Sequence, residues 1–453
     1  MRITPVRSGA LAAALLVLAG APAVAQTSLT IYQDGRVLAR RVVPLRLPAG
    51  TSQHRLALGT LDPGSVVALD PDVVILGAQY DAAVDDQNTM RRAIGRRLLF
   101  RVAPPRDTVS ALVLGVDPER FQLVDGTVSF GRPGEPMYPA DLVLLDPTLA
   151  LTLRAASARP TLALGWFTGG ASWQAAYQVV LGGTSARVAG HAVLQPGSLT
   201  VDTAEVQLLA GSVGQARPGQ PPMYRAREMA VAMAAPMDAA SAEQIGEVYL
   251  YTIPGRLSLR PGVVTTAALF DPASTGYERT FTVPGILPFY GPLQPGSEEG
   301  VTPVVVTYVL RRPLRTPFGD LPIPAGTVRL YQADDGGRSQ LVGEASVGHT
   351  APGQDLRVNA GTAFDLTARR VQTAYTTRRD SSRTIATVAY QVSIANAKDS
   401  VVTVEVLEER GGEWRVLDSS VPAESLSSTR TRFRVRVPAR GEAVLTYRLQ
   451  VTW

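Results

Sequence analysis

Most of the chain alternates hydrophobic and polar residues with a period of two, which is typical of β-strands that bury one face. The stretches 401–406 (VVTVEV) and 433–437 (FRVRV) show this pattern most clearly. Between such runs lie pairs of residues that can adopt the positive φ angles of tight hairpins. These pairs are Asp34-Gly35, Asp125-Gly126, Asp335-Gly336 and Gly411-Gly412. The pattern predicts an almost wholly β protein.

One short helix is predicted, because Asn88 or Thr89 can cap its N-terminus and Gly95 can end it. Three apolar residues share one face of this helix, namely Met90, Ala93 and Ile94. Short strands with tight connections follow it, at 97–102, 109–116, 121–124 and 127–130. This pattern predicts a small SH3-like barrel of five strands, inserted into a larger β domain.

The strand-rich segments predict several domains. Residues 26–86 and 141–214 form the predicted N-terminal β domain, and residues 87–140 form the inserted barrel. Residues 215–246 are rich in Pro, Ala and Met and lack alternation, so we expect a flexible linker there. Residues 247–453 form a predicted C-terminal β-sandwich domain. The expected fold class is therefore all-β, with multi-domain β-sandwich architecture, a small SH3-like barrel insertion and one or two short helices.

The first 25 residues have the three parts of a secretory signal peptide. Arg2 and Arg7 precede the apolar run 10–19, and the small-residue triplet 23–25 (AVA) follows a Gly-Ala-Pro break. The apolar run is shorter than the roughly 20 residues that a membrane-spanning helix needs, and the alternative is a buried N-terminal helix. Cleavage after Ala25 would make the protein periplasmic or extracellular.

Composition excludes several partners and sites. The formal net charge is +5, and two of these charges belong to the predicted leader, so no concentrated basic patch for nucleic acid is indicated. With 0 cysteines, the chain has no disulfide, no lipid-anchoring thiol and no thiolate ligand for a structural zinc ion.

No familiar catalytic motif is present. The 3 histidines, His54, His191 and His349, do not have metal-ligand spacing, and no G-x-S-x-G nucleophile elbow accompanies them. The single lysine, Lys398, does not follow a glycine, so a phosphate-binding P-loop is absent. We therefore assign no catalytic, cofactor-binding or metal-binding residue from the sequence and predict no enzyme activity and no cofactor.

Five features leave alternatives open. A glycosidase pair among the many carboxylates stays possible, and Asp334-Asp335 fits a hairpin turn better than a calcium site. Methionines between 215 and 245 fit loop composition or, less well, a copper site; they are Met223, Met229, Met233 and Met237. An arginine cluster around the short helix fits a solvated face or contact with anionic envelope polymers or lipid headgroups; it comprises Arg91, Arg92, Arg96, Arg97 and Arg101.

The C-terminal strand is the fifth feature. From Ala443 to Trp453 every second residue is apolar, and an outer-membrane β-barrel shows such an alternating strand with a terminal aromatic residue. The sandwich interpretation is preferred because many strands are short and prolines interrupt them often.

Several segments resemble an uncharacterised bacterial family. Residues 166–173 (WFTGGASW) with Ala176-Tyr177, residues 204–214 (AEVQLLAGSVG) and residues 318–331 (FGDLPIPAGTVRLY) are similar to its motifs. Weaker similarities are Gly343-Glu344, His349-Thr350, the run 361–366, Asn396, Trp414 and 445–447. The family is domain-of-unknown-function family 4139, the mucoidy-inhibitor-A-like exported β proteins. The resemblance covers about residues 29–453, and the sequence departs from the family's motifs at Gln195-Pro196-Gly197-Ser198 and at Trp166. The resemblance implies exported β domains. It carries over no catalytic residue.

These observations predict an exported cell-envelope β protein that acts as a non-enzymatic binding or scaffold module. The alternatives are an envelope-glycan hydrolase with a carboxylate pair and an outer-membrane β-barrel protein. The expected partner is an unknown envelope protein or polymer, with no nucleic acid and at most peripheral membrane contact.

Overall fold

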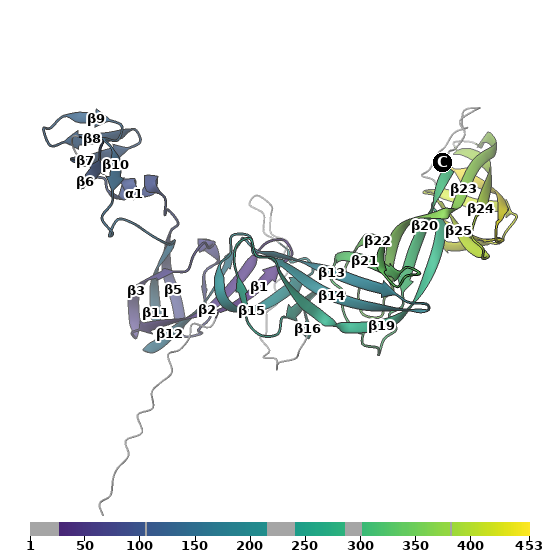
Figure 1. Cartoon of the computed structure of the whole chain (residues 1–453), viewed down its shortest axis with the longest axis horizontal. Coiled ribbons are helices and arrows are strands. Elements are labelled where there is room, and N and C mark those ends of the chain that lie inside the picture. Colours follow the sequence, from purple (N-terminus) through teal and green to yellow (C-terminus); the bar gives the residue numbers. More distant parts are fainter. Residues whose placement is uncertain (1–26, 105–106, 215–240, 286–300, 381–382) are drawn as a thin grey trace, which may run out of the picture. The chain divides into compact units, whose positions relative to one another are not determined.

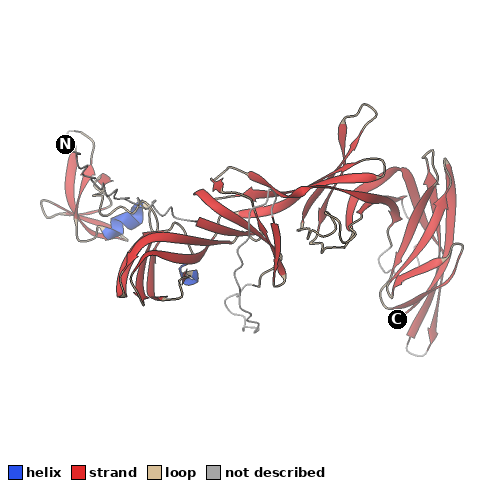
Figure 2. Ribbon diagram, turned by 90° about the horizontal axis from the view of Figure 1, so that it is seen from below, coloured by secondary structure: helices blue, strands red, loops and turns tan. Residues whose placement is uncertain are grey.

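The computed structural model describes residues 27–104, 107–214, 241–285, 301–380 and 383–453 (Figure 1). Almost all regular structure in these ranges is β, as Figure 2 shows. The helical elements within them are α1 (Asp86–Arg92) and a 3-10 turn at Pro63–Ser65. The predicted all-β, multi-domain fold class is therefore confirmed. The predicted leader and its cleavage site, and most of the predicted linker with its methionines, lie outside the described residues.

The chain divides into two compact units. Of the described residues, the first contains Thr27–Ser28 and Leu38–Thr168, and the second contains Leu29–Val37 with the described parts of Gly169–Trp453. Each unit is described separately below.

A three-stranded antiparallel sheet in the first unit follows the order β3 (Gly50–Ala57), β11 (Thr148–Ala155), β5 (Val73–Asp81). Alternation along β11 buries Leu149, Leu151, Leu153 and Ala155. The same unit holds β2 (Val37–Leu47), β12 (Arg159–Thr168) and β4 (Val67–Ala68), which neighbour one another in that order. Leu162 and Leu164 of β12 are also fully buried. The period of two therefore gives each sheet one apolar face for the core.

Residues 97–137 of the first unit form a five-stranded sheet whose strands pair only with one another among the described residues. The strands lie in the order β10 (Glu135–Met137), β6 (Arg97–Arg101), β7 (Thr108–Val116), β8 (Glu119–Leu123), β9 (Val128–Phe130). Phe100 and Phe121 meet edge to face, with ring centroids 5.2 Å apart, in a separate core. The two edge strands are not paired with each other, so the predicted barrel is an open sheet in this structure.

The helix α1 begins earlier than predicted. Its N-cap is Asp85, whose carboxylate accepts a hydrogen bond from the Asn88 N–H at 2.9 Å, so neither Asn88 nor Thr89 caps it. Met90 is fully buried, whereas Ile94 is 50% exposed and does not share the buried face. The prediction failed because Asp85 accepts from the backbone N–H three residues on, so Asn88 already lies inside the first turn.

In the second unit, four strands lie in the order β16 (Ser241–Ile245), β17 (Val248–Thr252), β15 (Val201–Ala210), β1 (Thr27–Tyr32), and β18 (Leu257–Leu259) also pairs with β15. The strand β16 occupies the end of the predicted linker, so that linker does not extend to residue 246. Its residues pair antiparallel with β17, from Ser241↔Thr252 to Ile245↔Val248.

The rest of the second unit is one long, curved succession of strands. Its first part follows the order β22 (Ser339–Val347), β21 (Gly326–Ala333), β13 (Ser172–Leu181), β14 (Ser185–Gln195), β19 (Thr265–Val283). Because β13 and β14 pair with β21 and β19, residues 169–214 lie in the second unit rather than with the N-terminal strands. At the β13–β21 contact Gly326 is required, since a Cβ there would lie 2.1 Å from the Ala175 carbonyl oxygen.

The C-terminal part of this unit is a sandwich. One wall contains β20 (Val301–Leu310), β23 (Leu356–Asp380), β24 (Arg383–Asn396), β29 (Gly441–Thr452) and β26 (Glu413–Ser419). The other contains the end of β19 with β25 (Val402–Glu409), β28 (Arg430–Val437) and β27 (Ala423–Ser427). Val404, Phe433 and Leu445 are fully buried in its core. The alternating residues Leu445, Tyr447, Leu449 and Val451 face inward as their pattern predicts.

Candidate functional site

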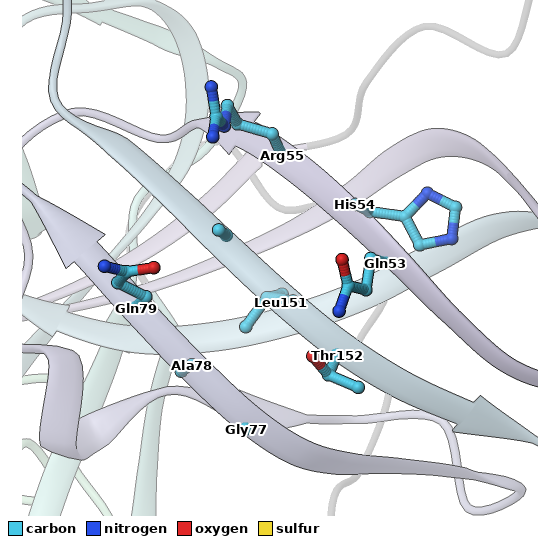
Figure 3. A pocket seen from close by; sticks show the side chains of 9 residues that line it. Gln53, His54, Arg55, Gly77, Ala78, Gln79, Leu151 and Thr152 are labelled. Carbon is cyan, nitrogen blue, oxygen red and sulfur yellow. The ribbon is translucent and has the colours of Figure 1, made fainter.

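A groove of about 370 Å³ lies on the sheet β3-β11-β5 of the first unit (Figure 3). Register places Arg55, Ala150 and Gln79 in one row across the three strands. The next row contains Gln53, Thr152 and Gly77. Since side chains at alternate positions share a face, these six residues lie on one side of the sheet, and the buried Leu151 faces the other side. The groove is thus a polar sheet face.

Small residues form the floor of this groove. Ala150 and Thr152 occupy the central strand, and Gly77 has no side chain. A Cβ added at Gly77 would meet no atom within 4 Å, and its φ angle does not require glycine. The missing side chain therefore leaves open space on the sheet rather than relieving a clash.

Longer polar side chains border the floor. Gln53, Arg55 and Gln79 are exposed, and their side chains make no hydrogen bond or ion pair with the described part of the chain. Their two amides and one guanidinium together offer many donors and two carbonyl acceptors in a small area. These groups are available to a ligand without breaking a side-chain hydrogen bond or ion pair of the described residues, and the Arg55 charge also helps to lower the pKa of Asp81.

One carboxylate, Asp81, lies beyond the groove in the next row of the sheet, opposite Thr148. It accepts hydrogen bonds from the Ala83 N–H at 3.0 Å and from Arg92 at 3.0 and 3.1 Å. The Ala83 hydrogen bond, followed by Arg92, lowers the pKa of Asp81. Among its described lining residues the groove has no Asp or Glu, so it offers no acid–base pair for glycosidic cleavage.

The histidines do not form a common site. His54 pairs with Leu151, so its side chain lies on the face opposite Gln53 and Arg55, where its Nε2 lies 2.9 Å from the Ser52 hydroxyl. His349 accepts a hydrogen bond from the Ala325 N–H at 3.1 Å through Nδ1, and His191 lies in β14 of the second unit. Within the described ranges, no group of three or more His, Cys, Asp or Glu could hold a metal ion.

The other sequence candidates have ordinary partners where they are described. Asp334 accepts from the Gly336 and Arg338 N–H groups, as a hairpin turn requires, and the positive φ of that turn lies at Gly337. Three members of the arginine cluster are ion-paired, which partly neutralises its charge; the pairs are Arg92–Asp81, Arg96–Asp141 and Arg101–Glu135.

A buried charged cluster lies in the C-terminal sandwich. The Glu408 carboxylate is 0% exposed and lies 3.2 Å from Arg370 and 3.3 Å from Arg410, both of which are also buried. It accepts a hydrogen bond from the Tyr447 hydroxyl, and Arg410 donates to the Tyr390 hydroxyl at 3.2 Å. Burial, with the Glu408 charge as a second cause, raises the pKa of Tyr447 well above its usual range. This cluster is enclosed by the core and offers no access to a ligand.

The sequence indicates this cluster through charged residues at strand positions that alternation directs inward. In 402–410 the inward positions are 402, 404, 406, 408 and 410, so the alternation itself puts Glu408 and Arg410 into the core. Arg370 continues the inward phase of Leu366 and Ala368 in the same way. Charged residues in the apolar phase of a strand are rare and indicate a paired cluster.

Arg312 is another fully buried cation, in the loop that follows β20. Its guanidinium donates to the carbonyls of Ala351 and Gln354 at 2.9 Å, of Phe318 at 3.2 Å, and of Leu321. Burial lowers the pKa of Arg312, and its charge is stabilised by these carbonyl dipoles rather than by a buried carboxylate. The residue organises two loops and is not a candidate for ligand contact.

No family model matches the chain, and comparison with curated proteins and with solved structures gave no match. The resemblance to domain-of-unknown-function family 4139 therefore stays a prediction. No helix within the described ranges is long and apolar enough to cross a membrane.

Proposed function

We propose that this protein is exported to the cell envelope and acts there as a non-enzymatic binding or scaffold module. The observation that carries the proposal is the groove on β3-β11-β5, where the polar side chains of Gln53, Arg55 and Gln79, which make no hydrogen bond or ion pair within the described residues, surround a floor of small residues. Binding sites typically combine a concave surface with a few placed polar groups that give orientation and specificity.

The chemistry of the groove favours a polar polymer. Side-chain amides donate and accept hydrogen bonds, and a guanidinium donates them. Suitable partners are hydroxyl, amide and carboxylate groups, all of which occur in peptidoglycan. The cross-strand rows of side chains recur at regular intervals along a sheet face. Such a regular spacing suits an extended polymer with a repeating structure. We therefore propose an envelope glycan as the ligand class.

The test is co-sedimentation of the purified mature protein with peptidoglycan sacculi. We expect binding by the natural chain and a loss of at least tenfold in affinity for the triple variant Q53A/R55A/Q79A. Gly77→Leu should also weaken binding, because its side chain occupies the open floor.

The matched control is Q174A/Q178A/R187A, which removes three exposed side chains of the same types that are unpartnered within the described residues of the second unit. It should bind like the natural chain. Equal binding by the groove triple variant, or no sedimentation of the natural chain, would show that the groove does not bind this polymer.

A further inference from the structure

The strands β19 and β25 of the C-terminal sandwich run parallel, but they pair over only three residues, from Phe281↔Val404 to Val283↔Val406. Both strands extend further toward their N-termini, since β19 begins at Thr265 and β25 at Val402. A groove of about 430 Å³ occupies the place where the pairing stops. Its walls are residues 278–281 on one side and 400–403 on the other.

Both walls present free main-chain edges to this groove. Residues 278–280 of β19 pair on their other edge with 307–309 of β20. Val402 and Thr403 of β25 pair on their far edge with Val437 and Arg436. In an antiparallel ladder, alternate residues direct N–H and C=O away from the partner strand. The groove is therefore bordered on two sides by backbone donors and acceptors that no strand pairing uses across it within the described residues.

The carboxylates at the groove are already neutralised by the protein itself. Glu278 forms an ion pair with Arg311 at 2.5 Å, and Glu405 forms one with Arg432 at 2.9 Å. Two carboxylates held in this way accept hydrogen bonds from arginines, so they do not supply the free proton donor of a glycosidase.

The arginines at the groove are not neutralised to the same degree. Arg279 is exposed, has no ion-pair partner among the described residues, and its guanidinium lies 5.2 Å from the centre of the Phe281 ring. Arg434 has a side chain that is 56% exposed and lies 3.7 Å from both Glu405 and Glu424. Of the four charged residues that line the groove, Arg279 alone has no ion-pair partner within the described residues, so its guanidinium is the charge left for a ligand.

We propose that this groove binds an extended acidic peptide segment, which inserts as an additional strand between β19 and β25. The main chain of the peptide pairs with the free edges, as in other cases of strand addition. A carboxylate of the peptide pairs with Arg279. Because Phe281 already pairs with Val404, the free edge of β19 spans residues 278–280 and accommodates about three residues of ligand.

The test uses fluorescein-labelled acetyl-Glu-Val-Glu-Val-Glu-Val-amide and fluorescence anisotropy with the full mature chain. We expect saturable binding of this probe and at least tenfold weaker binding of the Lys-Val counterpart. The same acidic peptide with alternate backbone nitrogens methylated should also bind at least tenfold more weakly, because it cannot complete the main-chain hydrogen bonds.

The variant R279E should weaken binding of the acidic peptide at least tenfold. The matched control is R378E, which reverses an exposed arginine of β23 that is unpartnered within the described part of the chain. On peptide addition, hydrogen exchange should slow in 278–280 and 400–403.

Absence of saturable binding would overturn the proposal, and so would equal binding of the Lys-Val peptide. Equal binding of the N-methylated peptide would overturn strand addition. The peptide comparisons need no variant, so they decide the question even if R279E folds poorly.

Discussion

Replacing Glu408 by glutamine should destabilise the C-terminal sandwich far more than its small change in shape suggests. The glutamate is the one carboxylate that contacts the two buried guanidiniums of Arg370 and Arg410 within the described residues. Glutamine keeps an oxygen for the Tyr447 hydroxyl but removes the negative charge. The variant would therefore leave two uncompensated cations inside the core.

The magnitude follows from the burial of all three groups. Side chains of Arg370, Arg410 and Glu408 are 1%, 3% and 0% exposed, so water cannot replace the lost charge. Removing one member of a buried ion pair typically costs about 3–5 kcal/mol. Tyr447→Phe, which leaves the charges in place and removes one donor, should cost about 1–3 kcal/mol.

Hydrogen exchange followed by mass spectrometry is the appropriate assay, because a chain of several domains does not unfold in one transition. Amides of β24 and β29 should exchange about 10²- to 10⁴-fold faster in E408Q, at 1.4 kcal/mol per tenfold. The triple variant R370M/E408L/R410M should recover most of the loss, since apolar replacement of a buried ion cluster is often neutral or stabilising. Exchange in E408Q within tenfold of the natural chain would refute the reasoning.

Other predictions concern separate parts of the chain. Arg312→Met should cost about 3 kcal/mol or more, seen as faster exchange in 312–355, because buried carbonyls lose their donor. The Tyr138 hydroxyl lowers the pKa of Asp86, so this contact stabilises the fold above the ordinary value of 3.8 and the contribution is lost as pH falls through the lowered pKa. Y138F should therefore reduce the acid dependence of stability in thermal melts from pH 2 to pH 5, by less than about 1 kcal/mol since the Asp86 side chain is 53% exposed. Deleting Trp453, whose side chain is 46% exposed, should cost about 1 kcal/mol in chemical denaturation. Intact mass of the exported chain should show cleavage after Ala25.

Local sequence signals predicted the strands well because their causes are local. Alternation requires only that one face be buried, and this holds in β11, β25 and β29. Turn glycines were located for the same reason, and Gly35 and Gly412 have φ angles of 91° and 78°. In the third turn the prediction was wrong by one residue, because Gly337 rather than Gly336 has the positive φ angle. Two adjacent glycines can each adopt such an angle, so the sequence alone does not decide between them.

Which strands pair could not be predicted in this way. The parallel pairing of β13 with β21 joins Ala175 to Gly326, and no pattern within either strand specifies a partner so distant in sequence. This pairing assigns residues 169–214 to the second unit. The predicted domain limits were drawn where the composition changes, which is in the loops. The compact units of the structure are instead defined by which strands pair with one another.

The candidate grooves depend on pairing even more strongly. Gln53, Arg55 and Gln79 are ordinary polar residues on the outward phase of their strands, and only the register of two ladders with β11 brings them around one floor. The second groove exists because the ladder of β19 with β25 stops at Phe281. Each strand there pairs along one edge and leaves the other open, and open edges readily accept another strand. Both proposed binding grooves therefore depend on the pairing of strands that are distant in sequence, and not on a sequence motif. For that reason a search for catalytic motifs in the sequence could not reveal either groove.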